Sequence, residues 1–351
     1  MAYTTIDDPT IYFNTKLYTG TGSSHAITGV GFSPNWVWIK HRNEANPHKI
    51  FDTVRGVGKS LKSNSTDAEA SDEENGYVSA FGSDGFTLVG GSTSSNDVNK
   101  SSGSYVAWNW KAGTTGSGTT TGTGTGKAYS YSVNTTSGFS IVKYLGNGSA
   151  GHTIPHHLGA VPKMIIVKRD AATNWSTYHA STGNGKSDPL NEGEVPTTAT
   201  TFWNDTTPTS SVFTVGSISN TNSNDSSVIA YCFAEKQGYS KFGSYTGNGN
   251  ADGTFVYLGF KPAFVMWKRT DTANNWMMGD NKQTPFNPQD NMMRADLANA
   301  QLSTNPVDFL SNGFKIRLIG NAFNGSGGTY IYMAFAESPL VSSTGVPGNA
   351  R

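Results

Sequence analysis

The sequence contains a single cysteine, Cys232, so an intrachain disulfide framework is excluded. This cysteine lies in the apolar run 228–233, where a buried and unreactive thiol is expected. Charge is also scarce, since Asp, Glu, Lys and Arg make up 14% of the 351 residues, against about 25% in typical globular domains. Aromatic residues make up 12%, which can build compact cores and is not the composition of a disordered chain.

Positive charge does not accumulate anywhere in the sequence. The formal net charge is zero and Lys and Arg form no cluster, so neither nucleic acid nor a polybasic contact with a membrane surface is expected. No apolar run approaches the roughly 18 residues of a membrane span, so membrane insertion is not expected. The N-terminus has no charged segment followed by an apolar one, which argues against a signal peptide.

One motif occurs three times. It consists of Tyr-x-Gly-x-Gly, then a proline, then an apolar run that ends in a lysine six residues after the proline. The copies begin at Tyr18, Tyr144 and Tyr245, and their lysines are Lys40, Lys168 and Lys268. A phenylalanine follows each lysine by 46, 45 and 46 residues, at Phe86, Phe213 and Phe314. Offsets this constant indicate a threefold internal repeat of about 100 residues, the size of a domain.

Short segments rich in β-branched and aromatic residues fill each copy, bounded by Gly, Asn, Asp and Ser, as is typical of all-β proteins. The closing segments 106–110, 229–233 and 331–335 hold large apolar residues at alternate positions. The segments after each proline are apolar on consecutive residues, which predicts strands covered on both faces, by a neighbouring unit or subunit. The predicted fold is all-β, with three tandem antiparallel β-sandwich repeats of the jelly-roll or lectin-like kind.

The Gly/Thr-rich segment 113–127 has no apolar side chain to bury, so it is predicted to be a linker or an extended surface loop. Repeats two and three join almost directly and are expected to pack side by side, with repeat one set apart. Short helices are considered for 65–74 and 288–300, and an edge strand for 11–13. The predicted domains are 1–113 (repeat one with an N-terminal lead), 114–127 (linker), 128–237 (repeat two), 238–340 (repeat three) and 341–351 (C-terminal tail).

The sequence contains partial matches to known functional motifs, but none of them is complete. Residues 53–60 end like a phosphate-binding loop, but Thr53 stands where glycine is required and no helix start follows. Residues 146–151 match the dinucleotide fingerprint, but Pro155 prevents the helix that must follow, so turn glycines with positive φ explain the pattern. His152, His156 and His157 lack further ligands at metal-binding spacing, so neither a metal nor another cofactor is predicted. No motif for a nucleophile elbow or a metalloprotease occurs; the chain is predicted not to be an enzyme, and no catalytic residue is named.

The repeated lysines and the aromatic residues after them are the candidates for binding. Each lysine is expected to lay its stem along the sandwich and to place its ammonium group in water or against a carboxylate, with a ligand role as the alternative. The apolar faces of sugar rings stack on aromatic side chains, so polar loops with aromatics can contact a receptor or a glycan. Core filling is the favoured alternative for the same rings. The candidate residues for receptor or glycan contact are Trp175, Tyr178, Trp276, Asn174 and Asn275.

Several segments of the sequence, taken together, resemble a known protein family. Residues 139–148 (FSIVKYLGNG) and 157–169 (HLGAVPKMIIVKR), followed by Asn174 and Trp175, resemble a repeat of tailed-phage virion proteins, many of them from marine and cyanobacterial phages. Residues 5–20 and 51–56 are similar to the start of that family, so the resemblance covers nearly the whole chain. It implies a concanavalin-like β-sandwich array on the outside of a virion, and it supplies no functional residues.

We therefore expect a structural protein of a tailed-phage virion, an adhesin-like fibre or appendage whose repeats present loops for attachment to the host surface. A capsid-surface decoration protein that stabilises the shell is the alternative, and a polysaccharide-degrading enzyme is a third hypothesis. The protein is expected to assemble in the host cytoplasm and to lie at the virion surface. Its expected partners are other virion proteins of the tail, the portal-proximal region or the capsid, further copies of itself in a trimer, and a host-surface glycan.

Overall fold

The computed structural model describes residues 2–71, 74–93 and 97–348. Regular structure in these residues is almost entirely β-strand; the exceptions are a 3₁₀ turn, η1 (Pro9–Ile11), and a four-residue helix, α1 (Ser219–Asn222). All pairings between the named strands are antiparallel. The prediction of an all-β fold is confirmed. No helix in the described residues is long and apolar enough to cross a membrane.

Sheet group one is the set of strands β1 to β9. Its four-stranded sheet has the order β1-β9-β3-β4, its three-stranded sheet has the order β2-β8-β7, and β5 pairs with β6. The bounds are β1 (Phe13–Thr19), β2 (His25–Thr28), β3 (Trp36–His41), β4 (Lys49–Asp52), β5 (Lys59–Ser60), β6 (Ala70–Ser71), β7 (Tyr77–Gly82), β8 (Gly85–Val89) and β9 (Ser104–Trp110).

Sheet group two is the set of strands β10 to β20, together with α1. A six-stranded sheet has the order β10-β12-β13-β20-β15-β16, a three-stranded sheet has the order β11-β14-β19, and β17 pairs with β18. The bounds are β10 (Thr114–Thr119), β11 (Thr121–Gly122), β12 (Ala128–Asn134), β13 (Phe139–Leu145), β14 (His152–Pro155), β15 (Pro162–Arg169), β16 (Ser176–His179), β17 (Lys186–Ser187), β18 (Thr197–Thr198), β19 (Val212–Val215) and β20 (Ser227–Ala234).

Sheet group three is the set of strands β21 to β28. They form one eight-stranded, nearly closed sheet with the order β21-β28-β23-β24-β25-β26-β27-β22. The bounds are β21 (Ser240–Thr246), β22 (Phe255–Tyr257), β23 (Phe260–Arg269), β24 (Met277–Asp280), β25 (Gln289–Arg294), β26 (Leu302–Leu310), β27 (Gly313–Ile316) and β28 (Thr329–Pro339).

The strands that carry the three copies of the motif hold equivalent places in the three groups. The orders β1-β9-β3-β4, β13-β20-β15-β16 and β21-β28-β23-β24 each begin with the strand that leads into Tyr-x-Gly-x-Gly. In each order the closing strand of the copy comes second and the apolar strand around the proline comes third. The constant offsets in the sequence therefore reflect one pairing scheme that is used three times.

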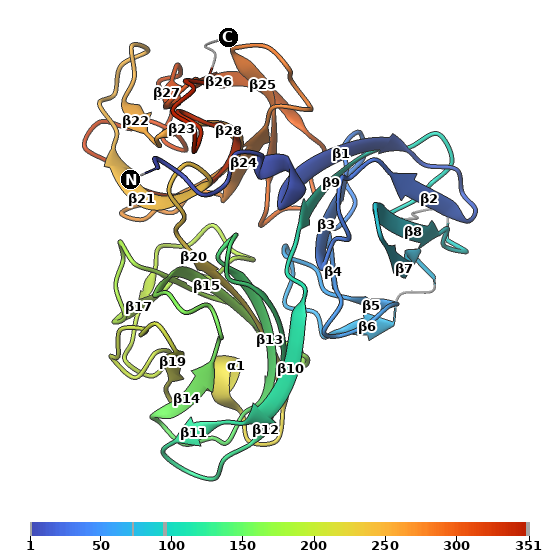
Figure 1. Cartoon of the computed structure of the whole chain (residues 1–351), viewed down its shortest axis with the longest axis vertical. Helices are drawn as coiled ribbons and strands as arrows, with labels where there is room; N and C mark the ends of the chain where they lie inside the picture. The colour runs from blue at the N-terminus through green and yellow to red at the C-terminus, as the bar shows by residue number, and fades with distance from the viewer. Residues whose placement is uncertain (1, 72–73, 94–96, 349–351) are drawn as a thin grey trace.

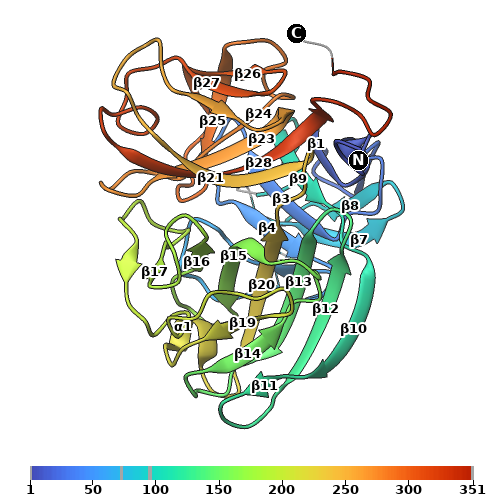
Figure 2. The same ribbon diagram turned by 60° about the vertical axis from the view of Figure 1, so that its left-hand side comes forward.

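A central core joins the three groups, which Figures 1 and 2 show arranged around a common centre. One hydrophobic cluster contains Trp36 and Trp110 from group one, Phe233 from group two, and Phe264 and Phe335 from group three. The opposite faces of the same strands pack into three further clusters, one inside each group. The post-proline strands are therefore buried on both faces, as predicted, and other groups of the same chain supply the second cover.

The expectation that the first repeat is set apart was wrong. Aromatic rings of group one contact rings of both other groups: the Trp36 and Tyr231 centroids lie 4.6 Å apart, and those of Trp110 and Phe335 lie 5.6 Å apart. These large apolar rings are removed from water only when all three groups are together.

The Gly/Thr-rich segment 113–127 is not a linker, because it forms β10 and β11. β10 pairs with β12 in a register that sets Gly116 opposite Tyr131 and Gly118 opposite Tyr129. A Cβ atom on Gly116 would lie 2.6 Å from the Tyr131 hydroxyl oxygen, so the tyrosine ring covers the glycine backbone. Aromatic side chains on a neighbouring strand thus compensate for the missing side chains of an edge strand.

Both helices considered from the sequence were also wrong. Residues 70–71 are strand β6, residues 65–69 form no helix, and residues 72–73 lie outside the described part. The segment 288–300 contains β25 instead of a helix, since Met292 and Met293 are buried and pair with β24. The expected edge strand begins at Phe13 and continues to Thr19 as β1.

The motif Tyr-x-Gly-x-Gly is a turn held by a buried asparagine. In the second copy the side-chain Oδ1 of Asn222 accepts from the backbone N–H of Asn147 (2.9 Å), and its main-chain carbonyl accepts from Gly148 (2.9 Å). Asn99 and Asn324 make the same pairs of contacts in the other two copies. Gly148 has a φ of 70°, where glycine is favoured, so the turn interpretation of this segment is confirmed.

The three motif lysines are fully buried, and their ammonium groups bind main-chain oxygens instead of water or a carboxylate. Lys40 donates to the carbonyls of His41 (2.5 Å) and Glu44 (3.1 Å), and Lys168 donates to those of Arg169 (2.9 Å) and Ala171 (2.8 Å). Burial lowers the pKa of both lysines to about 8. Lys40 and Lys168 each close the loop that follows their strand, whereas Lys268 donates to the carbonyls of Arg269 (3.1 Å) and of Gly193 in sheet group two (2.9 Å). These contacts explain the repetition without a ligand role.

Three ring N–H groups link the sheet groups in a closed cycle. They belong to the residues that directly precede β4, β16 and β24, and each donates to a backbone carbonyl of another group. The donors and acceptors are His48 Nε2 and Arg294 (2.9 Å), Trp175 Nε1 and Lys62 (2.9 Å), and Trp276 Nε1 and Pro189 (3.0 Å). His48 can donate from Nε2 because its Nδ1 accepts a hydrogen bond from the indole N–H of Trp38. The ring hydrogen of His48 is therefore on Nε2.

Candidate functional site

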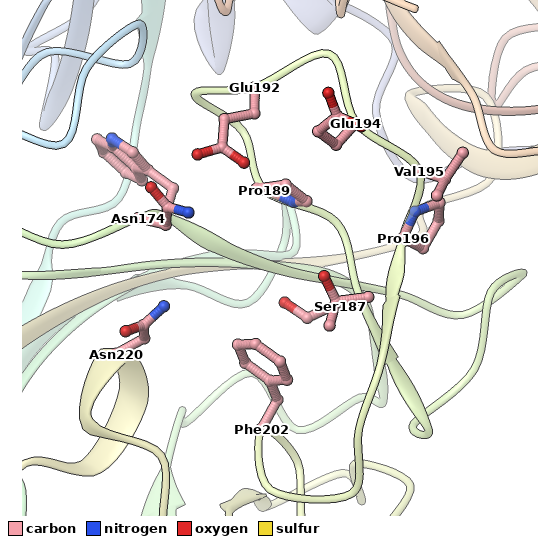
Figure 3. Close-up of a pocket in the computed structure, with 11 residues that line it drawn as sticks. Asn174, Ser187, Pro189, Glu192, Glu194, Val195, Pro196, Phe202 and Asn220 are labelled. Atoms are coloured by element: carbon pink, nitrogen blue, oxygen red, sulfur yellow. The ribbon is translucent and has the colours of Figure 1, made fainter. Parts of the chain in front are cut away.

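A pocket of about 340 Å³ opens in sheet group two, between the loop that follows β17 and the segment that precedes β16. Figure 3 shows Asn174 and Glu192 on one side of this pocket and Phe202 and Asn220 on the other. The volume falls in the range of roughly 300–1,000 Å³ that is usual for small-molecule sites. The residues that matter for its chemistry are Asn174, Trp175, Glu192, Glu194, Phe202 and Asn220.

The wall of the pocket at Trp175 is held rigidly. The backbone N–H of Trp175 donates to Asn191 Oδ1 (2.8 Å), and the Asn191 amide donates to Asn174 Oδ1 (3.0 Å). The indole N–H reaches the Lys62 carbonyl of sheet group one, and only 1% of Trp175 is exposed. Asn191 therefore holds both the backbone of Trp175 and the side chain of Asn174 in place at this wall.

Polar groups converge on the pocket from three segments. Glu192 is half-buried and Glu194 is exposed on the loop between β17 and β18. Asn220 lies on α1, where its Oδ1 accepts from the Thr173 hydroxyl (2.6 Å), so its position is fixed. Together with Phe202, a mostly buried ring, these groups offer hydrogen-bond acceptors, donors and an aromatic surface to one ligand.

Sheet group three supports the pocket loop from behind. The Gly193 carbonyl accepts from Lys268 Nζ (2.9 Å) and from the Asn274 backbone N–H (2.7 Å), and the Pro189 carbonyl accepts from Trp276. Burial lowers the pKa of Lys268 to about 8. It raises the pKa of Asp188, also on this loop, to about 7, although Lys268 acts in the opposite direction. The loop is thus a fixed part of the interface between two groups.

The structure does not present the predicted aromatic rings to a receptor. Trp175 and Trp276 are 1% exposed and Tyr178 is 3% exposed, so all three fill the core, which is the alternative that the sequence favoured. Asn174 lines the pocket, whereas Asn275 donates to Asp296 Oδ2 (2.7 Å) outside it. Only Asn174 and Trp175 of the five candidates meet in one site.

Four of the six residues that give the pocket its chemistry were not predicted. Phe202 and Asn220 follow no periodic pattern and reach the site only through the fold. Glu192 and Glu194 carry a weak signal, because two carboxylates flank a glycine in a chain that is poor in charge.

The histidines near the motif turn have structural contacts. His152 is buried between Asn222 Oδ1 (3.1 Å) and Thr120 Oγ1 (2.6 Å), and the His157 ring stacks on Tyr131 with a centroid distance of 3.7 Å. Across the part of the chain that the structure describes, no group of three His, Cys, Asp or Glu side chains is placed to hold a metal ion.

A family described as a domain of unknown function, DUF7483, matches residues 8–339. The chain belongs to the DUF7483 family. The match starts just ahead of β1 and ends at the last residue of β28, so the DUF7483 domain takes in all three copies of the motif and the whole pocket. No curated protein and no solved structure matches this DUF7483 chain.

Proposed function

We propose that the protein is a structural component of a tailed-phage virion that lies at the particle surface and binds a glycan of the host envelope. The resemblance of residues 139–148 and 157–169 to phage virion repeats supports the virion assignment. The pocket between Asn174, Glu192, Phe202 and Asn220 carries the binding assignment, because it joins an aromatic surface to hydrogen-bonding groups on a rigid frame.

The proposed architecture is three tandem β-sandwich repeats of the lectin-like type, one for each sheet group. The shared strand order of the three sheets supports this division, as does the separate hydrophobic cluster inside each group. The contacts between groups suit a rigid attachment platform, because the loop that forms the pocket is anchored in two of them. Assembly into a homotrimer stays a prediction.

Binding of host envelope polysaccharide to the purified protein tests the glycan assignment. We expect saturable binding in calorimetry that weakens roughly five- to tenfold in Glu192→Gln and in Asn220→Ala, because each change removes about one hydrogen bond to the ligand. Asp205→Asn is the matched control, since Asp205 is exposed in the same group and does not line the pocket. Equal binding by all four proteins would place the glycan elsewhere.

A cryo-electron map of the intact particle tests the virion assignment. We expect the chain at the tail tip or as a projection at the side of the tail. A position on the symmetry axes of the capsid would instead favour the decoration function, and the pocket would then have no role in attachment. Release of reducing ends from the polysaccharide would favour the third hypothesis, a degrading enzyme.

A further inference from the structure

A pocket of about 260 Å³ lies in sheet group three, where the two end strands of the eight-stranded sheet, β21 and β22, come together. Its walls come from the N-terminal lead, the segment between β20 and β21, β21 itself, and the residues at the end of β22. It shares no residue with the pocket of sheet group two. The lining residues used below are Tyr3, Glu235, Gln237, Lys241, Tyr257 and Gly259.

Tyr257 presents a positioned aromatic ring at this pocket. Its backbone carbonyl accepts from Lys241 Nζ (3.0 Å), and the same ammonium group lies 5.2 Å from the centroid of its ring. These contacts join β21 to β22 and hold the residue in place. Tyr257 is nevertheless 49% exposed, on the outer face of β22. An exposed ring gains free energy when an apolar surface covers it, so Tyr257 is a contact for a ligand with such a surface.

The hydroxyl groups of Tyr3 and Tyr257 meet over Gly259. The Tyr3 hydroxyl donates to the Gly259 carbonyl (2.6 Å). A Cβ atom on Gly259 would collide with the Tyr3 hydroxyl oxygen and would lie 3.5 Å from that of Tyr257. The N-terminal lead is fixed at a second point, because Thr4 Oγ1 donates to the Gln237 carbonyl (2.8 Å). The lead is thus a fixed part of the pocket wall.

Three further side chains offer polar groups that water can reach. Glu235 and Gln237 are exposed, and Lys241 is partly exposed. Glu235 uses Oε2 to accept from the Phe242 backbone N–H (3.3 Å), and Lys241 uses one N–H for the Tyr257 carbonyl. A carboxylate has about four acceptor sites and an ammonium group has three donors, so both keep capacity for a ligand.

The combination of these groups selects the class of ligand. Lys241 donates hydrogen bonds, Glu235 accepts them, and the Gln237 amide does both. A hydroxyl group is also a donor and an acceptor, so several neighbouring hydroxyl groups match all three side chains. A ligand with a net charge would be attracted by one of Lys241 and Glu235 and repelled by the other, which favours a neutral ligand. Neighbouring hydroxyl groups beside an apolar face are the surface of a sugar ring.

We propose that this pocket binds a neutral sugar ring, with its C–H face on Tyr257 and its hydroxyl groups on Glu235, Gln237 and Lys241. The volume is below the roughly 300–1,000 Å³ of sites for larger ligands, which limits the pocket to a single ring. This site goes beyond the proposed function, because it is separate from the pocket of sheet group two and does not depend on it.

The ring can be a free monosaccharide or one unit of a polysaccharide, and Phe255 distinguishes these sources. Phe255 precedes Tyr257 by two residues on the same outer face of β22 and is 44% exposed. Residues two apart on a strand are separated by about 7 Å. The next unit of a polysaccharide can therefore cover Phe255, whereas a monosaccharide on Tyr257 cannot.

Saturation-transfer NMR on the full-length protein tests the site. The single-ring probes are the methyl glycosides of glucose, galactose, mannose and N-acetylglucosamine, and the two-ring probes are cellobiose, maltose, lactose and diacetylchitobiose. We expect transfer to at least one probe, with affinity reduced about tenfold in Tyr257→Ala and about fivefold in Gln237→Ala. Both substituted side chains are exposed, so neither substitution removes a core contact.

Two controls separate the ring from its surroundings. Tyr257→Phe keeps the aromatic face and should keep the affinity within about threefold. Phe286→Ala should leave the affinity unchanged, because Phe286 is an aromatic residue of the same sheet group that is 77% exposed and outside the pocket. Phe255→Ala should weaken only the two-ring probes if the site takes a polysaccharide, and neither kind of probe if it takes a monosaccharide.

Absence of transfer to every probe would overturn the proposal, as would equal affinity in the natural protein, Tyr257→Ala and Gln237→Ala. Transfer that is lost in Glu192→Gln but unchanged in Tyr257→Ala would overturn it too, while leaving the pocket of sheet group two as the glycan site. The reverse pattern would support the site described here even if the pocket of sheet group two binds no glycan.

Discussion

Trp108 and Asp280 meet across the boundary between sheet groups one and three. The indole N–H of Trp108 donates to Asp280 Oδ2 at 3.0 Å, and both side chains are buried. Asp280 is the last residue of β24, and Asp52 holds the same place at the end of β4. Asp52 accepts from the Tyr231 hydroxyl of group two at 2.8 Å. The end of each of these strands is therefore a hydrogen-bonding contact to a neighbouring group.

The third contact of this kind uses the opposite polarity. His179 ends β16, and the residue of group three that corresponds to Trp108 and Tyr231 is Met333, whose side chain has no N–H or O–H group. His179 Nε2 instead donates to the Tyr332 carbonyl at 3.1 Å, and its Nδ1 accepts from Ser181. The last residue of the strand is thus a carboxylate that accepts a hydrogen bond at two boundaries. At the third boundary it is a histidine that donates one to a carbonyl.

Replacement of Asp280 by alanine should destabilise the whole protein. It leaves the Trp108 N–H and the two donors of Gln283 without their buried acceptor. We expect a loss of about 3 kcal/mol in the free energy of unfolding, measured by urea denaturation. Asp280→Asn keeps one acceptor oxygen and should lose less, and the exposed Asp170→Ala should change stability by less than about 0.5 kcal/mol.

His179 should make stability depend on pH. Burial lowers its folded-state pKa to about 4, whereas in the unfolded chain it is about 6.5. Between these values the unfolded state binds more protons, so stability is present above pH 6.5 and is lost as the pH falls towards 4. The difference of 2.5 in pKa corresponds to about 3 kcal/mol.

Comparison with His179→Gln isolates this contribution. Glutamine can donate to the Tyr332 carbonyl but does not titrate, so the stability advantage of the natural protein should shrink between pH 6.5 and 4. The raised pKa of Asp188 acts in the opposite direction, but it is common to both proteins and cancels in the difference. A difference that does not change with pH would show that His179 is not buried as a neutral ring.

Gly116→Val should loosen β10, because the new side chain displaces the Tyr131 ring from the strand. Valine has a higher strand propensity than glycine, so propensity alone would stabilise β10 instead of loosening it. We expect faster amide hydrogen exchange at residues 114–119, followed by mass spectrometry. Ser117→Val is the matched control on the same strand, where Ser117 is exposed, and it should slow the exchange or leave it unchanged.

The fragment 128–351 should fail to fold as a stable body. The fragment lacks group one and also β10 and β11 of group two. The rings of Phe139, Tyr231, Phe233, Phe264 and Phe335 lose the group-one partners that cover them in the central core. We expect aggregation or the loss of a cooperative thermal transition, measured by calorimetry. A soluble fragment with a sharp transition would show that groups two and three form a sufficient core by themselves.

Much of the fold could be predicted from the sequence because its strongest signals are local and repeated. Consecutive apolar residues after Pro34, Pro162 and Pro262 predicted strands with two covered faces, and this was confirmed. The error at 113–127 had a physical cause. The side chains that stabilise β10 belong to Tyr129 and Tyr131 on the next strand, so the glycine-rich segment itself contains no strand signal.

The candidate site was harder to predict for a related reason. Trp175 was among the predicted residues. However, the local sequence does not distinguish a tryptophan exposed on a loop from a tryptophan buried at a boundary between groups. The Lys62 carbonyl that binds its indole is 113 residues away, and periodicity gives no information about such a contact. Polar residues of the pocket come from separate loops, so only the folded chain shows that they meet.

The closed cycle of three groups has a consequence for how such a surface can change over generations. Where a three-part body is built from three identical chains, every substitution appears in all three parts, and a change that suits one part must be tolerated in the others. Here the three groups are encoded separately within one gene product. The loop at 187–197 can therefore change without a matching change in the other two groups, while the buried residues at the centre continue to hold one shared frame.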